Sequence, residues 1–594
     1  MHTKSKTILI VCLLSFFSYR LSAQEGEAIS WWEPAKHSFP VVEGQAWRGE
    51  VKESFDRLPG RAEGSVREAV WNLSKHSAGL VIRFYSNAEE IQVRYQVGGK
   101  NYAMPHMPAT GVSGVDLYAK DPHGNWLWAA GKYNFGDTIT YKFSGLRAND
   151  PQHKMGREYR LYLPLYAQTT WLHIGVKETD ILTPIPTRGE KPIVVYGTSI
   201  AQGGCASRPG NAWPAILGRA MDRPLINLGF SGNGRLEKEV LEMISEIDAK
   251  IYILDCLPNL LPPRVSHEEL KTLLLSAVRL LREKRPDTPI LLAEHAGYTD
   301  AGINEGRKES FESVNKTVQG VYKELTAQGV HGLYYVSMAE FGQDINTTVD
   351  GTHQNDLGML LYANGYEKVL RDILHEPKGK ISTTIPVTQR REPHNYEWEE
   401  RHEAILKLSG SMSSSNVFIG NSILHFWGGK PEAKIKHGEN PWNKHIEKHS
   451  VVNMAFGWDR IENVLWRIYH DALEGYAPEK IFLMIGTNNM HLNTDEEIVE
   501  GLKVLVEAIH YRQPEATILL SGIFPRRHEE NRLTGLNNTI EKTFSRESYI
   551  RYVNPGPVLL GKDGKIDESN FSDGLHPNEK GYKVLGKAIS ILFE

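Results

Sequence analysis

The chain has 594 residues, of which 40% are hydrophobic and 24% are charged, and its formal net charge at pH 7 is −4. This composition is typical of a globular protein and predicts two to four domains, at about 150 residues per domain. A nearly balanced charge, without a long block of one sign, argues against nucleic acid as a partner.

Residues 1–23 have the pattern of a secretory signal peptide. Lys4 and Lys6 precede an apolar run at 8–17, and small residues before Gln24 offer a cleavage site. The run is shorter than the roughly 20 apolar residues that span a bilayer. The predicted cleavage point has no cysteine, so lipid attachment is not indicated. We therefore expect a secreted or periplasmic protein, with no membrane insertion after signal cleavage.

Two cysteines remain after the predicted signal, Cys205 and Cys256. An exported protein can join such a pair, but a chain of this size does not need a disulfide to hold its core. The sequence leaves open both the disulfide and the oligomeric state.

Residues 24–185 have the pattern of an all-β domain. Apolar and polar residues alternate at 91–97, 159–163 and 172–176, and Gly, Pro, Asn and Asp break the runs. This period of two predicts antiparallel strands in a sandwich of jelly-roll type. Trp126 and Trp128 lie in its loop-rich middle, where we expect core or interdomain packing; stacking on sugar is the alternative.

The pattern changes to α/β at Pro192. Short buried runs at 193–196, 251–254 and 290–293 alternate with helical stretches, which predicts a parallel sheet with helices on both faces. This first unit spans 186–376, and we call it unit one.

A polar stretch at 377–394 is predicted to be a linker, and a second α/β unit follows at 395–594. We call it unit two. It opens with a charged helix at about 396–407, and strands are expected at 417–419, 481–485 and 517–520.

The two units have the pattern of an internal duplication. Ser266 and Glu269 form a predicted capping box in unit one, and Thr494 and Glu497 form the same box in unit two. In both units the helix that follows ends before a proline and a strand comes next, so each box lies at the same stage of its unit.

A Gly-x-Ser-Ile turn directly follows the first predicted strand of each unit, with Ser199 in unit one and Ser422 in unit two. The carboxyl end of a parallel strand is where open α/β sheets place their ligands, and a helix that begins there favours negative charge. Such turns are common and usually structural, so other residues must support a catalytic role.

An Asp-x-x-His segment closes each unit, as Asp350 to His353 and as Asp573 to His576. The carboxylate can orient the imidazole, which accepts the serine proton and later returns it to the leaving alcohol. A helix cap or a pair of metal ligands are the alternatives. No further ligand stands at matching spacing, so we expect no metal.

Serine and histidine are 154 residues apart in both units. A structural cap has no reason to keep its distance from a remote turn, whereas a nucleophile and its base do. Between them each unit offers oxyanion donors: a backbone N–H in a glycine turn, Gly232 or Gly457, and the side chain of Asn259 or Asn488 after a buried strand.

With Ser, Gly, Asn and Asp-x-x-His in the same order, both units resemble the SGNH/GDSL hydrolases from end to end. The resemblance implies two flavodoxin-like three-layer α/β/α domains, no cofactor, and ester hydrolysis through an acyl-serine. It assigns nucleophile, oxyanion, base and orienting roles to Ser199, Gly232, Asn259, His353 and Asp350, and in unit two to Ser422, Gly457, Asn488, His576 and Asp573.

The chain departs from the family pattern at a few positions. Thr198 and Asn421 stand before the nucleophiles, where the family usually has Asp, and Asn489 replaces an Asp. Trp458 falls where many relatives have the oxyanion glycine, and Gly457 is one residue earlier. After the third strand of unit one, Glu294 and His295 are expected either to line the pocket or to be structural.

Two further segments carry a resemblance. Residues 114–118, Gly-Val-Asp-Leu-Tyr, are similar to the signature of a β domain that precedes some bacterial SGNH esterases, and residues 457–467 are similar to the platelet-activating-factor acetylhydrolase-like branch. Several relatives in both groups are carbohydrate acetylesterases.

We therefore expect a serine esterase with two active sites that removes O-acetyl groups from plant polysaccharides or oligosaccharides. An acylhydrolase of short-chain lipids and a glycan-binding protein with degenerate hydrolase units are the alternatives.

Overall fold

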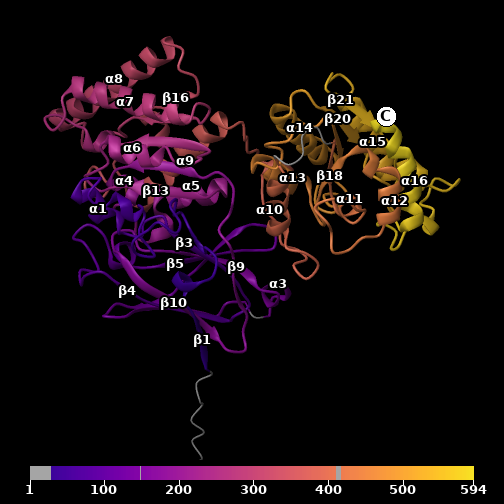
Figure 1. The fold of residues 1–594 in the computed structure, drawn as a ribbon, viewed down its shortest axis with the longest axis horizontal. Helices are drawn as coiled ribbons and strands as arrows, with labels where there is room; N and C mark the ends of the chain where they lie inside the picture. Colours follow the sequence, from indigo (N-terminus) through magenta and orange to yellow (C-terminus); the bar gives the residue numbers. More distant parts are fainter. Residues whose placement is uncertain (1–27, 148, 410–415) are drawn as a thin grey trace, which may run out of the picture.

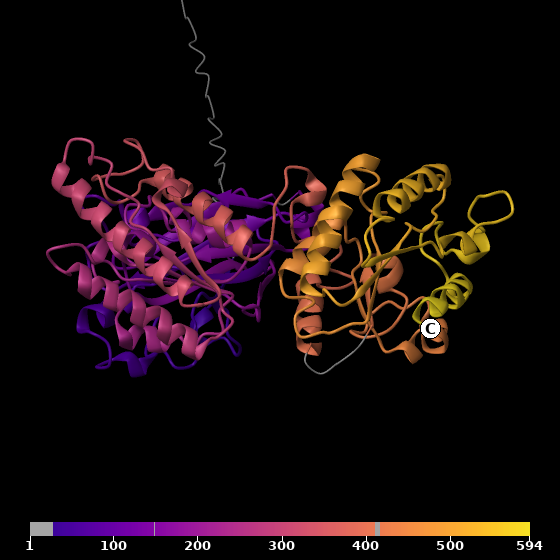
Figure 2. The same ribbon diagram turned by 90° about the horizontal axis from the view of Figure 1, so that it is seen from above.

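A computed structural model describes residues 28–147, 149–409 and 416–594. The β domain lies below unit one, and unit two forms a separate lobe beside them (Figures 1 and 2). The predicted signal peptide lies outside the described residues. Within those residues, no helix combines the length and the apolar character that crossing a membrane requires.

Two antiparallel sheets form the β domain, which confirms the predicted sandwich class. One has the order β1 (Ile29–Trp32), β10 (Thr169–Lys177), β4 (Glu90–Val97), β8 (Ile139–Ser144) and β7 (Lys132–Asn134). The other has the order β11 (Leu182–Pro184), β3 (Val81–Ser86), β9 (Arg157–Tyr162), β5 (Asp116–Lys120) and β6 (Trp126–Ala129), with β2 (Val42–Glu43) beside β3. Three short helices lie in the connections: α1 (Glu68–Ser74), α2 (Ala109–Val112) and α3 (Pro151–Lys154).

The alternation in β4 has its expected cause, because every second side chain from Ile91 to Val97 enters the core between the sheets. β9 is buried on nearly every residue instead. Trp126 donates from Nε1 to the carbonyl of Arg219 in unit one, as expected for an interdomain contact, whereas Trp128 is 52% exposed.

Unit one is built on a five-stranded parallel sheet, with the order β13 (Leu225–Gly229), β12 (Ile193–Gly197), β14 (Ile251–Asp255), β15 (Ile290–Ala293) and β16 (Leu333–Val336). Its helices are α4 (Ser199–Gln202), α5 (Trp213–Met221), α6 (Lys238–Ile244), α7 (His267–Lys284), α8 (Glu305–Ala327) and α9 (Asp356–Ile373). One apolar cluster lies between the sheet and α6, α7 and α8, and another lies between the opposite face and α5 and α9. These are the three layers predicted.

Unit two repeats this sheet in the same order, with β18 (Val451–Ala455), β17 (Asn416–Gly420), β19 (Lys480–Met484), β20 (Thr517–Ser521) and β21 (Ile550–Val553). Its helices are α10 (Trp398–Leu408), α11 (Ser422–His425), α12 (Glu439–His445), α13 (Ile461–Tyr469), α14 (Asp495–Arg512), α15 (Glu530–Phe544) and α16 (Glu579–Ser590). Apolar clusters again fill both faces of the sheet. The predicted α/β class is confirmed for both units.

The capping positions also agree with the duplication. Ser266 accepts from the backbone N–H of Glu269 at the start of α7, and Thr494 forms a complete capping box with Glu497 at the start of α14. Both helices have 18 residues.

Buried charges join the domains. The guanidinium of Arg223 in unit one donates to Asp471 Oδ2 at 3.1 Å and to the carbonyl of Tyr469 at 2.7 Å, both in unit two. Lys250 reaches the other oxygen of Asp471 at 2.7 Å. Arg223 is fully buried in the folded chain. Separation of the two units would therefore break the ion pairs of Asp471 and expose these charges to solvent.

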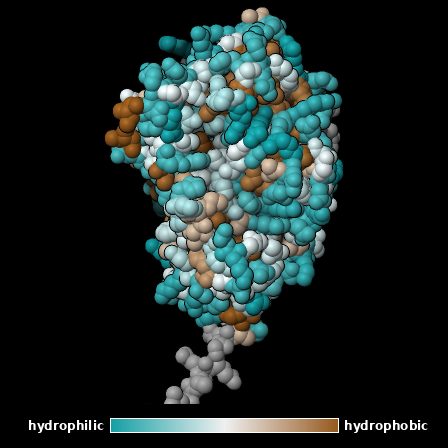
Figure 3. Space-filling model, turned by 90° about the vertical axis from the view of Figure 1, so that its left-hand side faces the viewer, coloured by the Kyte–Doolittle hydropathy of each residue, from teal (hydrophilic) through white to brown (hydrophobic). Residues whose placement is uncertain are grey.

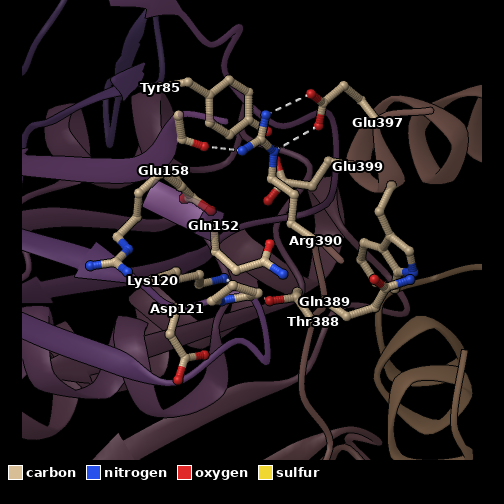
Figure 4. A pocket seen from close by; sticks show the side chains of 14 residues that line it. Tyr85, Lys120, Asp121, Gln152, Glu158, Thr388, Gln389, Arg390, Glu397 and Glu399 are labelled. Atoms are coloured by element: carbon tan, nitrogen blue, oxygen red, sulfur yellow. Dashed lines mark hydrogen bonds and ion pairs between the residues drawn. The ribbon is translucent and has the colours of Figure 1, made fainter. Parts of the chain in front are cut away.

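A polar hollow lies between the β domain and the segment at 388–399 that precedes and begins α10 (Figure 4). There Arg390 lies over the ring of Tyr85 at 3.9 Å and forms an ion pair with Glu397. Neither Ser199 nor Ser422 lines this hollow, so we assign it to domain contact.

Arg223→Met should destabilise the junction, because it leaves the buried Asp471 with Lys250 alone. We expect the first unfolding transition in urea to lose about 3 kcal/mol, with faster proteolysis at 377–394. Arg61→Met is the control, since its ion pair with Glu246 is nearly half exposed and should cost under about 1 kcal/mol. Equal losses in the two variants would contradict this role for Arg223.

Candidate active sites

Both candidate nucleophiles begin a short helix at the carboxyl end of a central strand. Ser199 follows β12 and opens α4, and Ser422 follows β17 and opens α11. The residues before them cap these helices: the side chain of Thr198 accepts from the N–H of Ile200 at 3.3 Å, and that of Asn421 accepts from Ile423 at 3.0 Å. A hydroxyl or amide oxygen thus caps these helices at the position where the family usually has Asp.

The Asp-x-x-His segments meet these serines in both units. The Oγ of Ser199 lies 2.8 Å from His353 Nε2, and His353 Nδ1 lies 2.8 Å from Asp350 Oδ2. In unit two the Ser422–His576 distance is 2.9 Å and the His576–Asp573 distance is 2.7 Å. A carboxylate can only accept, so Nδ1 carries the ring proton and Nε2 accepts from the serine hydroxyl.

Each carboxylate is fixed on its own segment. Asp350 accepts from the backbone N–H of His353 at 2.8 Å, and Asp573 accepts from that of His576 at 2.7 Å. Partial burial raises the pKa of Asp573, but hydrogen bonds from the ring and backbone of His576 outweigh it and lower the pKa to about 2. The same opposed effects lower the pKa of Asp350. Both groups are therefore ionised at neutral pH, as the orienting role requires.

Gly232 and Asn259 lie where unit one needs oxyanion donors. Gly232 has φ +68°, and its N–H donates to no other described residue. The Asn259 amide satisfies its neighbours when its oxygen accepts from the N–H groups of Asn233 and Gly234, both at 3.0 Å. Its NH2 group then points away from this turn and is free to donate to a substrate oxygen.

The assignment of Gly457 as the oxyanion donor of unit two is wrong. Its N–H donates to His425 Nδ1 at 2.9 Å, just as the N–H of Ser231 donates to Gln202 Oε1 in unit one. Gly457 therefore corresponds to Ser231, and Trp458 corresponds to Gly232.

The strand register supports this correspondence, because Gly197 pairs with Gly229 and Gly420 pairs with Ala455. Trp458 has φ +62°, close to that of Gly232, and its N–H donates to no other described residue. Asn488 corresponds to Asn259, and one amide hydrogen donates to the carbonyl of Asp459 at 2.9 Å. Its second amide hydrogen remains for the substrate.

A buried arginine holds each oxyanion turn from behind. Arg57 of the β domain donates to the carbonyls of Asn227 and Gly229 in β13, at 3.0 and 2.8 Å. Arg401 in α10 donates to the corresponding carbonyls of Asn453 and Ala455 in β18, at 2.8 and 3.0 Å.

Each guanidinium also lies over the phenylalanine that follows its strand, at 5.0 Å for Arg57 over Phe230 and 5.3 Å for Arg401 over Phe456. Burial lowers the pKa of both guanidinium groups to about 9, so both stay charged at neutral pH. Sequence reasoning missed both arginines, because they lie far from the motifs along the chain.

The remaining candidates have structural roles. Glu294 is buried and accepts from the backbone N–H of Met338 at 2.7 Å, and the ring of His295 accepts from Gly297 at 2.9 Å. Cys205 and Cys256 are buried free thiols. Among the described residues, no group of three or more His, Cys, Asp or Glu side chains could hold a metal ion.

Family models match the chain in three consecutive segments. The N-terminus of Esterase_SGNH_hydro-type matches 29–182, and models of the GDSL-like Lipase/Acylhydrolase family match 190–371 and 418–584. The crystal structure of a GDSL-like lipase from Bacteroides ovatus is 33% identical and covers 59% of this chain and 98% of its own, with a TM-score of 0.53. The chain belongs to the SGNH/GDSL hydrolase family.

Two other proteins show a weaker similarity to this SGNH hydrolase. The platelet-activating factor acetylhydrolase IB subunit alpha1 of Homo sapiens is 26% identical over 199 residues, which are 33% of this chain and 82% of that protein. A family two carbohydrate esterase from Clostridium thermocellum, in complex with cellohexaose, is 15% identical and covers 50% of this chain and 92% of its own, with a TM-score of 0.36.

Arg57→Lys should impair unit one of this hydrolase selectively, because a lysine cannot bond both strand carbonyls in one plane. With unit two silenced by Ser422→Ala, we expect kcat for 4-nitrophenyl acetate to fall about tenfold or more, with a smaller change in KM. Arg401→Lys in a Ser199→Ala background should do the same to unit two. A loss of equal size in both units from either variant would indicate general unfolding instead.

Asp255 is a buried carboxylate that ends β14 beside the nucleophile turn, and it was not among the predicted site residues. Its Oδ2 accepts from the hydroxyls of Tyr362 and Tyr366, at 3.1 and 3.0 Å. Burial raises its pKa, the two hydroxyls oppose this, and the net pKa is about 6. Unit two has Met484 at this position of the register.

The raised pKa predicts how stability changes with pH. The folded protein binds this proton more tightly than the unfolded chain, so the contribution is complete below about pH 4 and is lost as the pH rises through about 6. A shift of about two pKa units corresponds to roughly 3 kcal/mol.

Asp255→Asn should therefore gain unfolding free energy relative to wild type as the pH rises from 4.5 to 8, measured by urea unfolding. Asp137→Asn, at a side chain that is 87% exposed, is the control. A difference between Asp255→Asn and wild type that stays constant over this range would refute the assignment.

Proposed function

We propose that this chain is an exported serine esterase that removes O-acetyl groups from carbohydrate at two separate active sites. The observation that carries the proposal is the closed Ser–His–Asp hydrogen-bond chain in each unit, with serine–histidine distances of 2.8 and 2.9 Å. Export rests on the N-terminal sequence pattern alone.

The reaction follows from the geometry. The serine Oγ attacks the acyl carbon while histidine Nε2 accepts its proton, and the carbonyl oxygen becomes an oxyanion. In unit one that oxygen meets the N–H groups of Ser199 and Gly232 and the amide of Asn259; in unit two it meets Ser422, Trp458 and Asn488.

The imidazolium, stabilised by its aspartate, then gives the proton to the leaving alcohol, and an acyl-serine remains. Water attacks the acyl-serine by the same route, with histidine again as the base, and releases the acid.

The names of two groups of relatives support a small acyl group. The acetylhydrolase relatives, by their name, act on acetyl groups.

A polar alcohol is supported by the surroundings of the serines. His106 of the β domain lies with its ring 5.9 Å from that of His353, and Tyr166 donates to the carbonyl of Ser199 at 3.2 Å. The side of the β domain and unit one that faces the viewer in Figure 3 is largely hydrophilic, and its apolar residues stand in small separate groups. A lipid hydrolase usually needs a broader apolar surface to meet its substrate.

Acetate release from acetylated xylan or pectin tests the proposal. Ser199→Ala and Ser422→Ala should each remove the share of one unit, and the double variant should lose roughly 10³-fold or more, because its nucleophiles are gone. If the double variant releases acetate as fast as wild type, the proposed mechanism fails. If one single variant already abolishes release, only one unit acts on that polymer.

A short-chain lipid ester is the second candidate substrate, because the relatives named above are platelet-activating factor acetylhydrolases. The same four proteins separate the two candidates when acetylated xylan and a 2-acetyl phospholipid are compared. Preference for the phospholipid would replace the carbohydrate assignment and leave the two-site mechanism standing.

A further inference from the structure

Trp458 is an unusual residue at the active site of unit two. Its backbone is in the left-handed region at φ +62°, which bulky residues rarely adopt, and its side chain is 44% exposed. The left-handed backbone and the exposed apolar indole each lower the stability of the fold. Backbone strain of this kind persists mainly at functional sites.

Trp458 stands at the proposed oxyanion position of unit two. If its N–H donates to the oxyanion, its Cα is within about 4.5 Å of the oxygen of the reacting carbonyl. In unit one the corresponding residue is Gly232, and a Cβ built there meets nothing within 4 Å. A side chain at this position therefore enters open space at the mouth of the site.

Hydrogen bonds hold the backbone around Trp458. Arg391 donates to the carbonyl of Trp458 at 2.8 Å, and the next residue, Asp459, is buried and accepts from Trp398 at 2.8 Å and from Arg467 at 3.0 Å. Within the described residues, the indole of Trp458 has no stacking and no cation–π partner. The exposed part of the indole therefore has no aromatic or cationic partner among these residues.

We propose that the indole of Trp458 is the platform on which the sugar ring of the substrate stacks in unit two, while unit one leaves this position open. The proposal rests on the esterase function proposed for unit two. A flat indole matches the C–H face of a pyranose, whereas an acetyl group is too small to cover it.

Polar groups next to the oxyanion residue Asn488 suit a sugar as well. His491 and Arg526 lie 3.1 Å apart, and Arg526 also donates to the carbonyl of Thr487, next to the oxyanion residue Asn488. Both side chains can bond hydroxyl groups around a stacked ring. The two centres would therefore accept different acetylated sugars, which gives a physical reason for keeping both.

The test uses the full chain with unit one silenced by Ser199→Ala, combined with Trp458→Gly or Trp458→Phe. For Trp458→Gly, we expect the ratio of kcat/KM for acetylated xylo-oligosaccharide to that for 4-nitrophenyl acetate to fall about tenfold. Most of the change should be in KM. Trp458→Phe keeps a smaller ring, and its kcat/KM ratio should lie between those of Trp458→Gly and of the chain with Trp458. The thermal midpoint of Trp458→Gly should hold or rise, because glycine relieves the strained backbone.

Trp128→Ala is the matched control, since that indole is also about half exposed but belongs to the β domain. An unchanged ratio in Trp458→Gly would overturn the proposal. So would a loss on 4-nitrophenyl octanoate that exceeds the loss on the oligosaccharide, because the indole would then contact the acyl chain.

Binding separates this proposal from the proposed function. In the Ser199→Ala, Ser422→Ala variant, calorimetry with the acetylated xylo-oligosaccharide should show binding that Trp458→Gly weakens about tenfold. If Ser199→Ala does not hydrolyse 4-nitrophenyl acetate, the esterase function of unit two fails, and calorimetry still decides whether Trp458 binds sugar. No difference between the two binding curves would overturn the platform.

Discussion

A buried guanidinium bonded to two strand carbonyls is the contact on which both proposed active sites depend. Arg57 and Arg401 fix the carboxyl ends of β13 and β18. The segments that carry the proposed oxyanion donors begin directly after these strands. A hydrogen bond to the oxyanion stabilises the transition state best when its donor is in place before negative charge develops on the substrate oxygen. The serine–histidine pair supplies the chemistry, and the arginine keeps the backbone donor where that chemistry needs it.

The source of the arginine explains the domain organisation. Unit two takes Arg401 from α10, its own first helix, whereas unit one takes Arg57 from the β domain. The β domain therefore contributes to the proposed active site of unit one, where the ring of His106 also lies 5.9 Å from that of His353. The buried hydrogen bonds of Arg223 connect unit one to unit two. All three domains are therefore joined by buried polar contacts.

Duplication preserved the geometry of the two centres but not their surroundings. Strand order, triad distances and the N–H contacts behind the oxyanion turn agree between the units. Asp255 in one unit corresponds to Met484 in the other, and Gly232 corresponds to Trp458. The first difference is expected to change how stability responds to pH, and the second underlies the sugar platform proposed for unit two. Both replacements leave the backbone in place, because the strand register and the φ angles of Gly232 and Trp458 agree between the units.

The sequence alone determined the fold class, the duplication, and the serines, histidines and aspartates that the fold brings together. Strand and helix periodicity and a four-residue Asp-x-x-His spacing are local, so they can be found without coordinates. Only the tertiary structure decided that Trp458 rather than Gly457 stands at the position of Gly232, and that Arg57 and Arg401 support the two turns. Those facts depend on the register between strands and on contacts across up to 172 residues of chain, and no local pattern encodes either.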